Sequence, residues 1–130
     1  MPVRLYGHLS WVTFARLPRI DERVAEFLSR FLPAECMRHG AQPLALGLVR
    51  DHVHMVIKLP SRFDAPRLVQ GLKGASARLA NRDGLMPRAP LRWAEGYDLR
   101  SVGVRQLGTV LAYVENQAAR HPELTVDQCP

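Results

Sequence analysis

Cysteine is scarce in this chain, and long apolar runs are absent. The only two cysteines, Cys36 and Cys129, lie far apart and form no CxxC pattern, which argues against a disulfide framework or a zinc site and favours reduced thiols. No apolar run approaches the roughly 18 residues that span a bilayer. The N-terminus also lacks the features of a secretory signal peptide. We therefore expect a cytoplasmic protein with no membrane partner.

Lysine is scarce as well, so arginine carries nearly all of the positive charge. Lys and Arg total 18 against 12 Asp and Glu, with Lys58 and Lys73 the only lysines, and the net charge is +6. The planar guanidinium group donates two parallel hydrogen bonds to a phosphate, so this balance favours an anionic partner. At 130 residues and 47% hydrophobic content, we expect one domain, 1–130, with its own core.

Hydrophobic periodicity predicts the order strand, helix, strand, strand, helix, strand, helix. The predicted strands are 5–14, 42–49, 52–59 and an interrupted stretch at 91–102, and the predicted helices are 21–38, 64–82 and 103–120. Pro33 predicts a kink or break in the first helix, and Gly71 and Gly74 predict a close approach of another backbone to the second. The order is typical of a ferredoxin-like, RRM-like α+β sandwich, in which an antiparallel sheet carries helices mainly on one face.

The segment "RDHVHMVIKLP" (50–60) places two histidines on one face of a predicted strand. Successive side chains of a strand alternate between faces, so His52 and His54 project together, away from the apolar row that starts at Val53. Two such imidazoles, about 6 to 7 Å apart, can bind one metal ion if a third ligand is near. The alternative, half-exposed strand histidines without a role, has about equal weight.

The segment "YVENQ" in the last predicted helix offers a candidate for that ligand. Tyr113 and Gln117 are four residues apart and share one helix face, apart from the packed stripe of Leu107, Leu111, Val114 and Ala118. On its own, such a pair more often consists of two solvent-exposed residues on a surface helix. Beside a His-x-His strand, however, a tyrosine nucleophile with two imidazoles and an amide oxygen supplies the parts of a DNA-nicking site.

Five segments together resemble one known family. They are "GHLSWVTFARLP", "DHVHMVIKLP", "LVQGLKGASAR", "LRWAEGYDLRSVG" and "YVENQ", and they occur in the family's order over residues 5 to 121. The chain resembles the single-tyrosine transposases of IS200/IS605-type insertion sequences, relatives of the REP-associated tyrosine transposases in the His-hydrophobic-His (HUH) endonuclease superfamily. The glutamine of "YVENQ" favours the IS200/IS605 branch.

The resemblance implies a site and a reaction. It makes His52, His54 and Gln117 the ligands of Mg²⁺ or Mn²⁺, and Tyr113 the nucleophile that forms a 5′-phosphotyrosine while nicking and rejoining single-stranded DNA at insertion-sequence ends. It further implies that the partners are single-stranded DNA hairpins at the element ends, and that the protein is a homodimer with shared active sites.

For several other charged and aromatic residues, both a functional and an ordinary structural role are consistent with the sequence. Candidate phosphate contacts are Lys73, Arg78, Arg92 and Arg100, although each is also an ordinary surface residue. Asp51 is interpreted as a cap of the hairpin. His8 is interpreted either as a neighbour of the metal face or as a packing residue, with packing favoured about two to one. Tyr97 is a rival nucleophile that more often would serve packing or DNA contact.

Two alternative functions remain open from the sequence. The first is a non-catalytic or domesticated single-stranded nucleic-acid-binding protein on the same fold, although the chain lacks the aromatic run of such modules. The second is a metallohydrolase using His52, His54 and a carboxylate, for which no Asp or Glu is placed as well as Gln117.

Overall fold

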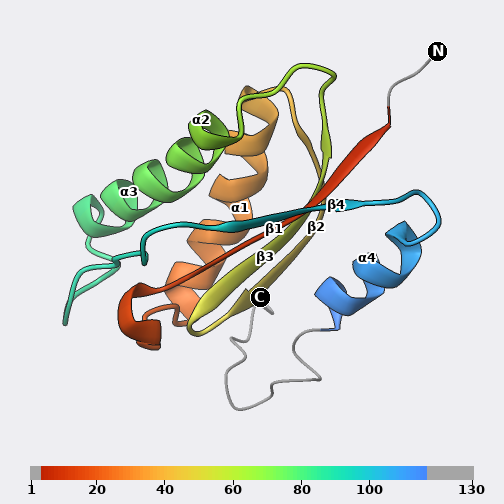
Figure 1. Cartoon of the computed structure of the whole chain (residues 1–130). Helices are drawn as coiled ribbons and strands as arrows, with labels where there is room; N and C mark the ends of the chain where they lie inside the picture. Colours follow the sequence, from red (N-terminus) through yellow and green to blue (C-terminus); the bar gives the residue numbers. More distant parts are fainter. Residues whose placement is uncertain (1–3, 117–130) are drawn as a thin grey trace.

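A four-stranded antiparallel sheet organises the molecule, and the computed structural model describes residues 4–116 (Figure 1). The strands are β1 (Leu5–Val12), β2 (Gln42–Val49), β3 (His52–Leu59) and β4 (Asp98–Val102). The helical segments are η1 (Phe14–Arg16), α1 (Glu22–Arg38), α2 (Ala65–Gln70), η2 (Gly71–Ala75), α3 (Ser76–Arg82) and α4 (Leu107–Glu115). The strand order is β2-β3-β1-β4, which confirms the predicted ferredoxin-like sandwich.

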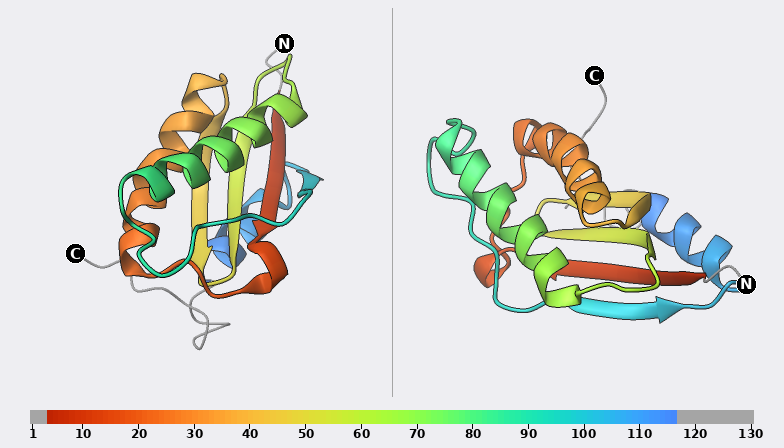
Figure 2. Two further views of the ribbon diagram at one scale, coloured as in Figure 1. Left: turned by 90° about the vertical axis from the view of Figure 1, so that its left-hand side faces the viewer. Right: turned by 90° about the horizontal axis from the view of Figure 1, so that it is seen from above.

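The two faces of the sheet are covered differently. The segments α2, η2 and α3 follow one another without a gap and form one helical rod. Figures 1 and 2 show this rod and α1 together on one face of the sheet, with α4 on the other. The first face holds the main core, to which β3 contributes Val53, Met55 and Ile57, all fully buried. The strand alternation read from the sequence is therefore correct, and the histidines of β3 belong to the α4 face.

The helix starts follow from local sequence. The Asp21 side chain accepts a hydrogen bond from the Val24 backbone N–H (2.9 Å), and Asp64 accepts one from the Arg67 N–H (3.1 Å). Both are standard N-caps, which satisfy backbone donors that have no partner inside the helix. α1 continues through Pro33, so the expected break does not occur.

The predicted helix 64–82 is instead interrupted by a π-helical turn, η2. A Cβ atom added at Gly71 would lie 2.6 Å from Glu35 Oε2 and 2.7 Å from His39 Nε2, whereas one at Gly74 would meet nothing within 4 Å. The atoms nearest Gly71 belong to side chains of α1 and of its C-cap residue, so the predicted approach of another backbone is not found at either glycine.

Three other boundaries differ from prediction. The first strand ends at Val12 and continues into a 3-10 turn, and only Asp98–Val102 of the stretch 91–102 forms a strand, preceded by an isolated bridge between Thr13 and Trp93. The last helix begins at Leu107. It ends at Glu115 with Asn116 as its C-cap, short of the predicted end near Arg120. Among residues 4–116, no helix has the length and apolarity needed to cross a bilayer.

Candidate active site

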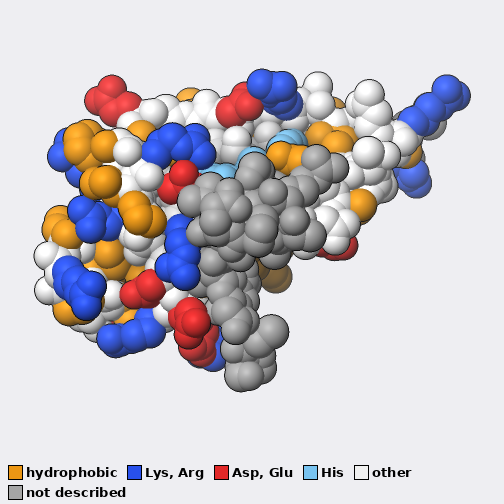
Figure 3. Space-filling view, turned by 90° about the horizontal axis from the view of Figure 1, so that it is seen from below, with side chains coloured by type: hydrophobic (Ala, Val, Ile, Leu, Met, Phe, Trp, Pro, Cys, Tyr) orange, Lys and Arg blue, Asp and Glu red, His pale blue; other side chains and the backbone are white. Residues whose placement is uncertain are grey.

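The two histidines of the HVH segment lie on the central strand β3, flanked by β2 and β1. His52 is buried, with 8% of its surface exposed, and His54 is half-buried. Their ring centroids lie 4.6 Å apart and the rings are nearly perpendicular. Figure 3 shows histidine side chains reaching the surface of this side of the molecule, with Lys and Arg side chains around them. The predicted common face of the pair is confirmed.

Asp51 holds His52 from the hairpin turn. Its Oδ1 lies 2.6 Å from His52 Nδ1, while its Oδ2 lies 3.2 Å from Arg16 Nε. Burial alone would raise the pKa of the Asp51 carboxyl, but the hydrogen bond from His52 and the charges of His52 and Arg16 lower it overall. Arg16 has a positive φ of 53°, a conformation that costs L-residues of order 1 kcal/mol. The Asp51 carboxylate thus bonds to the side chains of His52 and Arg16 instead of capping the hairpin backbone, and it orients one imidazole.

His8 of β1 holds His54 in the same way. His8 Nε2 lies 3.0 Å from His54 Nδ1, and the ring centroids lie 5.2 Å apart with an interplanar angle of 26°. Burial lowers the pKa of His8, the Asp98 carboxylate raises it, and Arg100 lowers it again, with a net decrease. Of the two sequence interpretations of His8, the structure supports a position beside the histidine pair, although the sequence did not predict the bond to His54. Only the antiparallel register of β1 and β3 brings two histidines 46 residues apart together.

Tyr113 of α4 lies over these rings. Its ring centroid is 6.1 Å from that of His54 and 6.3 Å from that of His8, with the tyrosine ring edge-on to both. Val114, the next residue, is almost fully buried and fixes α4 against the sheet. The predicted stripe is correct at Val114, while Leu107 and Leu111 are half-buried and Ala118 lies outside the described residues. The nucleophile candidate and the histidine pair thus come together within one chain.

The donor set is suited to a divalent ion that takes two imidazoles and a further oxygen. The described residues include no group of three or more His, Cys, Asp or Glu side chains that would hold a metal by themselves. Gln117, the predicted third ligand, lies outside the described residues. α4 ends at Glu115 with Asn116 as its C-cap, so the helix face that the sequence predicts Tyr113 and Gln117 to share stays a prediction.

Lys73, a predicted DNA contact, has structural partners. Its Nζ donates hydrogen bonds to the backbone carbonyls of Ala94 and Gly96, each at 2.7 Å. Burial lowers the pKa of Lys73, and the Glu95 carboxylate opposes this decrease. Lys73 therefore ties the π-helical turn to the segment before β4, and its contact with DNA stays a prediction.

The three predicted arginines are exposed and lie at separate places. Arg78 is on α3, in the helix layer. The Arg92 guanidinium lies 4.0 Å from the centroid of the Phe14 ring, a cation–π contact. Arg100 pairs with Asp98 at 2.9 Å on β4, whose register places Arg100 opposite His8. Of the three, Arg100 is thus next to the histidines. Tyr97, the rival nucleophile, is 40% exposed and directly precedes β4.

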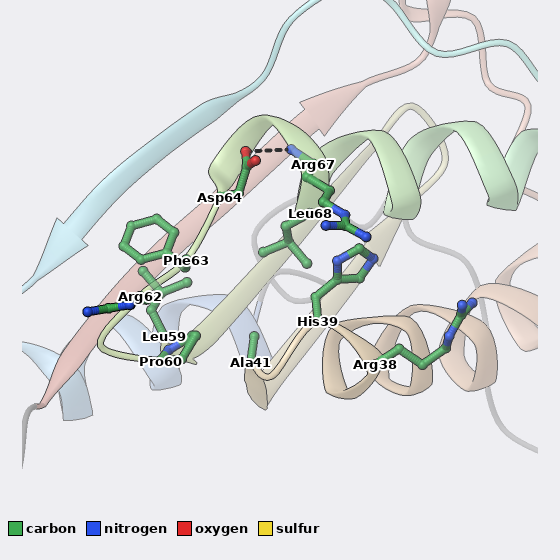
Figure 4. Close-up of a pocket in the computed structure, with 10 residues that line it drawn as sticks. All are labelled: Arg38, His39, Ala41, Leu59, Pro60, Arg62, Phe63, Asp64, Arg67 and Leu68. Carbon is green, nitrogen blue, oxygen red and sulfur yellow. Dashed lines mark hydrogen bonds between the residues drawn. The ribbon is translucent and has the colours of Figure 1, made fainter.

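A second site, which the sequence did not indicate, lies at the other end of β3. A cavity of about 370 Å³ opens between the end of α1 and the start of α2 (Figure 4). We call it the basic pocket; its charged and aromatic lining residues are Arg38, His39, Arg62, Phe63, Asp64 and Arg67. Phe63 is 43% exposed. Guanidinium groups beside an exposed ring are the chemistry of a nucleotide-binding surface.

Comparison with known proteins decides the family. The sequence matches the family described as "Transposase IS200 like" over residues 3–117. The chain belongs to this family of IS200-like transposases. It is 31% identical to the ISDra2 transposase TnpA of Deinococcus radiodurans over 75 residues, which are 58% of this chain and 54% of the relative. The matched segment thus spans about half the length of this curated relative.

Two solved structures share the fold of this IS200-like transposase chain. One is the crystal structure of a Deinococcus radiodurans R1 protein assigned to the transposases, with a TM-score of 0.73, 27% identity and coverage of 90% of this chain and 93% of that one. The other is a REP-associated tyrosine transposase bound to a REP hairpin, with a TM-score of 0.69 and coverage of 93% and 70%. At 10% identity, the second shows the fold alone.

Proposed function

We propose that this chain nicks and rejoins single-stranded DNA at insertion-sequence ends, with Tyr113 as the nucleophile. The observation that carries the proposal is the position of the Tyr113 ring, 6.1 Å from His54 between centroids, within the same chain. In an IS200-like transposase this position supports a catalytic role.

In the proposed reaction the Tyr113 oxygen attacks the scissile phosphorus. A bond forms between the phenolic oxygen and phosphorus, the bond from phosphorus to the 3′ oxygen breaks, and the phenolic proton passes overall to the leaving 3′ hydroxyl. The 5′ phosphate stays on Tyr113 as a phosphotyrosine. Attack by a 3′ hydroxyl reverses the step and joins strands, so no external energy source is consumed.

His52, His54 and Gln117 would hold Mg²⁺ or Mn²⁺ in this site. The bound ion would supply Lewis-acid polarisation of the scissile phosphate, which assists attack by a weak nucleophile such as a phenol. Imidazole nitrogens suit Mn²⁺ better than Mg²⁺, since Mg²⁺ prefers oxygen ligands. The chain's own contribution is to orient both imidazoles through Asp51 and His8.

The proposed DNA partner is a hairpin with a single-stranded extension. The basic pocket would bind the hairpin through arginine–phosphate contacts and stacking on Phe63, while the extension reaches Tyr113. The hairpin bound by the REP-associated relative is consistent with this partner class. The proposal also includes a homodimer with shared active sites, as the family resemblance implies, in which exchange of α4 between subunits would form the same pairing of Tyr113 and His54 across the dimer.

A non-catalytic single-stranded DNA-binding protein is the competing function, because it would use the same basic surface without Tyr113 chemistry. Covalent capture separates the two. Oligonucleotides from the DNA that flanks the gene, with and without their imperfect palindromes, are incubated with Mn²⁺ or EDTA and analysed under denaturing conditions.

We expect a metal-dependent adduct with the wild-type chain and none with Tyr113→Phe. Tyr97→Phe is the matched control. It should still form the adduct, because Tyr97 has no role in the proposed reaction. An adduct that survives Tyr113→Phe, or that peptide mapping assigns to Tyr97, would contradict the mechanism. Binding without any adduct in any metal would favour the competing function.

A further inference from the structure

Each of the two β3 histidines has its Nδ1 atom engaged by a different kind of group. His52 Nδ1 lies 2.6 Å from a carboxylate oxygen of Asp51. His54 Nδ1 lies 3.0 Å from Nε2 of another imidazole, that of His8. The first arrangement has only one meaning, because an ionised carboxylate can only accept, so His52 carries its proton on Nδ1.

The second arrangement has two possible meanings. A neutral imidazole carries one N–H and one lone pair, so either His54 donates from Nδ1 to His8, or His8 donates from Nε2 to His54. If His54 accepts at Nδ1, its remaining proton is on Nε2, and that nitrogen has no lone pair for a metal. If His54 donates, Nε2 carries the lone pair, as it does in His52.

We propose that His8 is the positioning residue for His54: it accepts the Nδ1–H of His54 and so fixes the tautomer in which Nε2 binds the ion. This inference rests on the proposed function and deepens it. Metal-bound histidines usually donate their other N–H to a carboxylate, a carbonyl or a water. Here the His8 imidazole is the acceptor for His54, and the Asp51 carboxylate is the acceptor for His52.

The geometry of the sheet supports this role over simple packing. In the antiparallel register, His8 stands opposite Val56, and Ser10 stands opposite His54, so His8 is a diagonal neighbour of His54 on the same face. The two ring planes are inclined by only 26°, and the nitrogens that are 3.0 Å apart lie between centroids 5.2 Å apart, so the rings meet edge to edge as an in-plane hydrogen bond requires. This restrains the rotation of His54 as well as its proton. The His8 ring also lies 6.3 Å from the Tyr113 ring between centroids, steeply inclined to it, so one residue orients a ligand and borders the nucleophile.

The tautomer can be measured without metal or DNA. In protein labelled with ¹⁵N-histidine at about pH 8, well above the ordinary histidine pKa of about 6.5, long-range ¹H–¹⁵N spectra report which ring nitrogen carries the proton. We expect Nδ1–H for His52 and His54 and, because His8 accepts at Nε2, Nδ1–H for His8. A wild-type spectrum with His54 protonated on Nε2 would overturn the proposal, whatever any variant does.

Substitutions then test the consequence for the ion. His8→Phe keeps a flat ring but has no acceptor, so His54 should lose its single tautomer, and Mn²⁺ affinity, measured by calorimetry without DNA, should fall about 10- to 100-fold. His8→Gln places an amide oxygen near the position of Nε2. It should restore most of the Mn²⁺ affinity and the single tautomer of His54. Tyr6→Phe, on the same strand two residues away, is the control and should change neither.

The outcomes separate this inference from the proposed function. If wild type and His8→Phe bind Mn²⁺ equally, or if Mn²⁺ line-broadening shows His8 itself as a ligand, the positioning role is wrong even when Tyr113 forms its adduct. If wild type shows the expected tautomers but Tyr113 forms no adduct, the proposed function fails and the tautomer assignment stands.

Discussion

The histidine cluster on the α4 face and the basic pocket on the opposite face, which α1, α2 and α3 cover, are built from different kinds of elements. In the cluster, His8, His52, His54 and Tyr113 contact one another at fixed distances, and β1, β3 and α4 supply them. The basic pocket is lined by side chains from the end of α1, the loop after β3 and the start of α2, with Phe63 exposed. The two sites are separated by the length of β3, roughly 23 Å for seven steps of 3.3 Å.

This difference corresponds to two kinds of task. Chemistry requires groups held within a fraction of an ångström, which strands and packed helices provide. Binding a flexible polyanion requires positive charge and an aromatic surface that adapts, which loops provide. We therefore expect substitutions in the cluster to abolish cleavage with little effect on DNA affinity, and substitutions in the pocket to do the reverse.

The largest effect is expected from His54→Ala. Loss of one imidazole ligand should leave no detectable covalent adduct, while DNA affinity stays within about twofold, because the phosphate contacts are elsewhere. His39→Ala, a matched histidine substitution in the helix layer, should retain the adduct at saturating DNA. Adduct formation at a normal rate by His54→Ala would remove this residue from the proposed metal site.

His52→Ala and His54→Ala should differ in their free energy of unfolding, whereas the sequence alone predicts the same small cost for both. The alternating pattern placed both histidines on a non-core face, where substitutions cost about 0.5 kcal/mol or less. His52 is in fact buried and bonded to the buried Asp51. His52→Ala should therefore reduce the free energy of unfolding by about 1 to 3 kcal/mol, whereas His54→Ala should cost less. Urea unfolding of both variants measures the difference.

Sequence periodicity predicted the fold well because strand alternation and helix spacing are local properties. His52 and His54 shared a face as expected, and the RD hairpin fixed the β2–β3 pairing. The contact of His8 with His54 depends on the register between strands 46 residues apart, which no local pattern encodes. The basic pocket likewise gathers residues from 38 to 68, each unremarkable in its own segment.

The second largest effect is expected in the basic pocket. Phe63→Ala should weaken hairpin binding by about 1 to 3 kcal/mol through lost base stacking. Arg62→Gln and Arg67→Gln should each reduce the salt dependence of binding by roughly one phosphate equivalent. Adduct yield at saturating DNA should stay normal in all three. Arg30→Gln, which breaks an exposed pair with Glu26 on α1, is the control.

Unchanged affinity in Phe63→Ala would mean that the hairpin lies elsewhere. A lower adduct yield at saturating DNA would mean that the pocket and the cluster are coupled. Either result would contradict the division of tasks between the two faces.

Gly71→Ala should have the next effect, on stability alone. The added Cβ would lie 2.6 Å from Glu35 Oε2 and 2.7 Å from His39 Nε2, so the Glu35–His39 pair must shift, at a cost of about 1 to 3 kcal/mol. Gly74→Ala meets nothing within 4 Å and should be neutral or stabilising by up to about 1 kcal/mol. Urea unfolding measures both. Equal stability of the two variants would show that η2 yields at Gly71.

The smallest effect is expected from Arg100→Gln, and it tests whether DNA crosses the histidine face at all. Arg100 lies opposite His8 in the sheet and pairs with Asp98, but both side chains are exposed, so the pair contributes little to stability. The guanidinium is therefore available to a phosphate, and its loss should lower affinity for the single-stranded extension about fivefold and the salt slope by about 0.7. Asp98→Asn should do the opposite, because it removes a carboxylate that competes with the phosphate and repels it. If neither substitution changes the affinity or the salt slope, the strand approaches Tyr113 from the β2 side of the sheet instead.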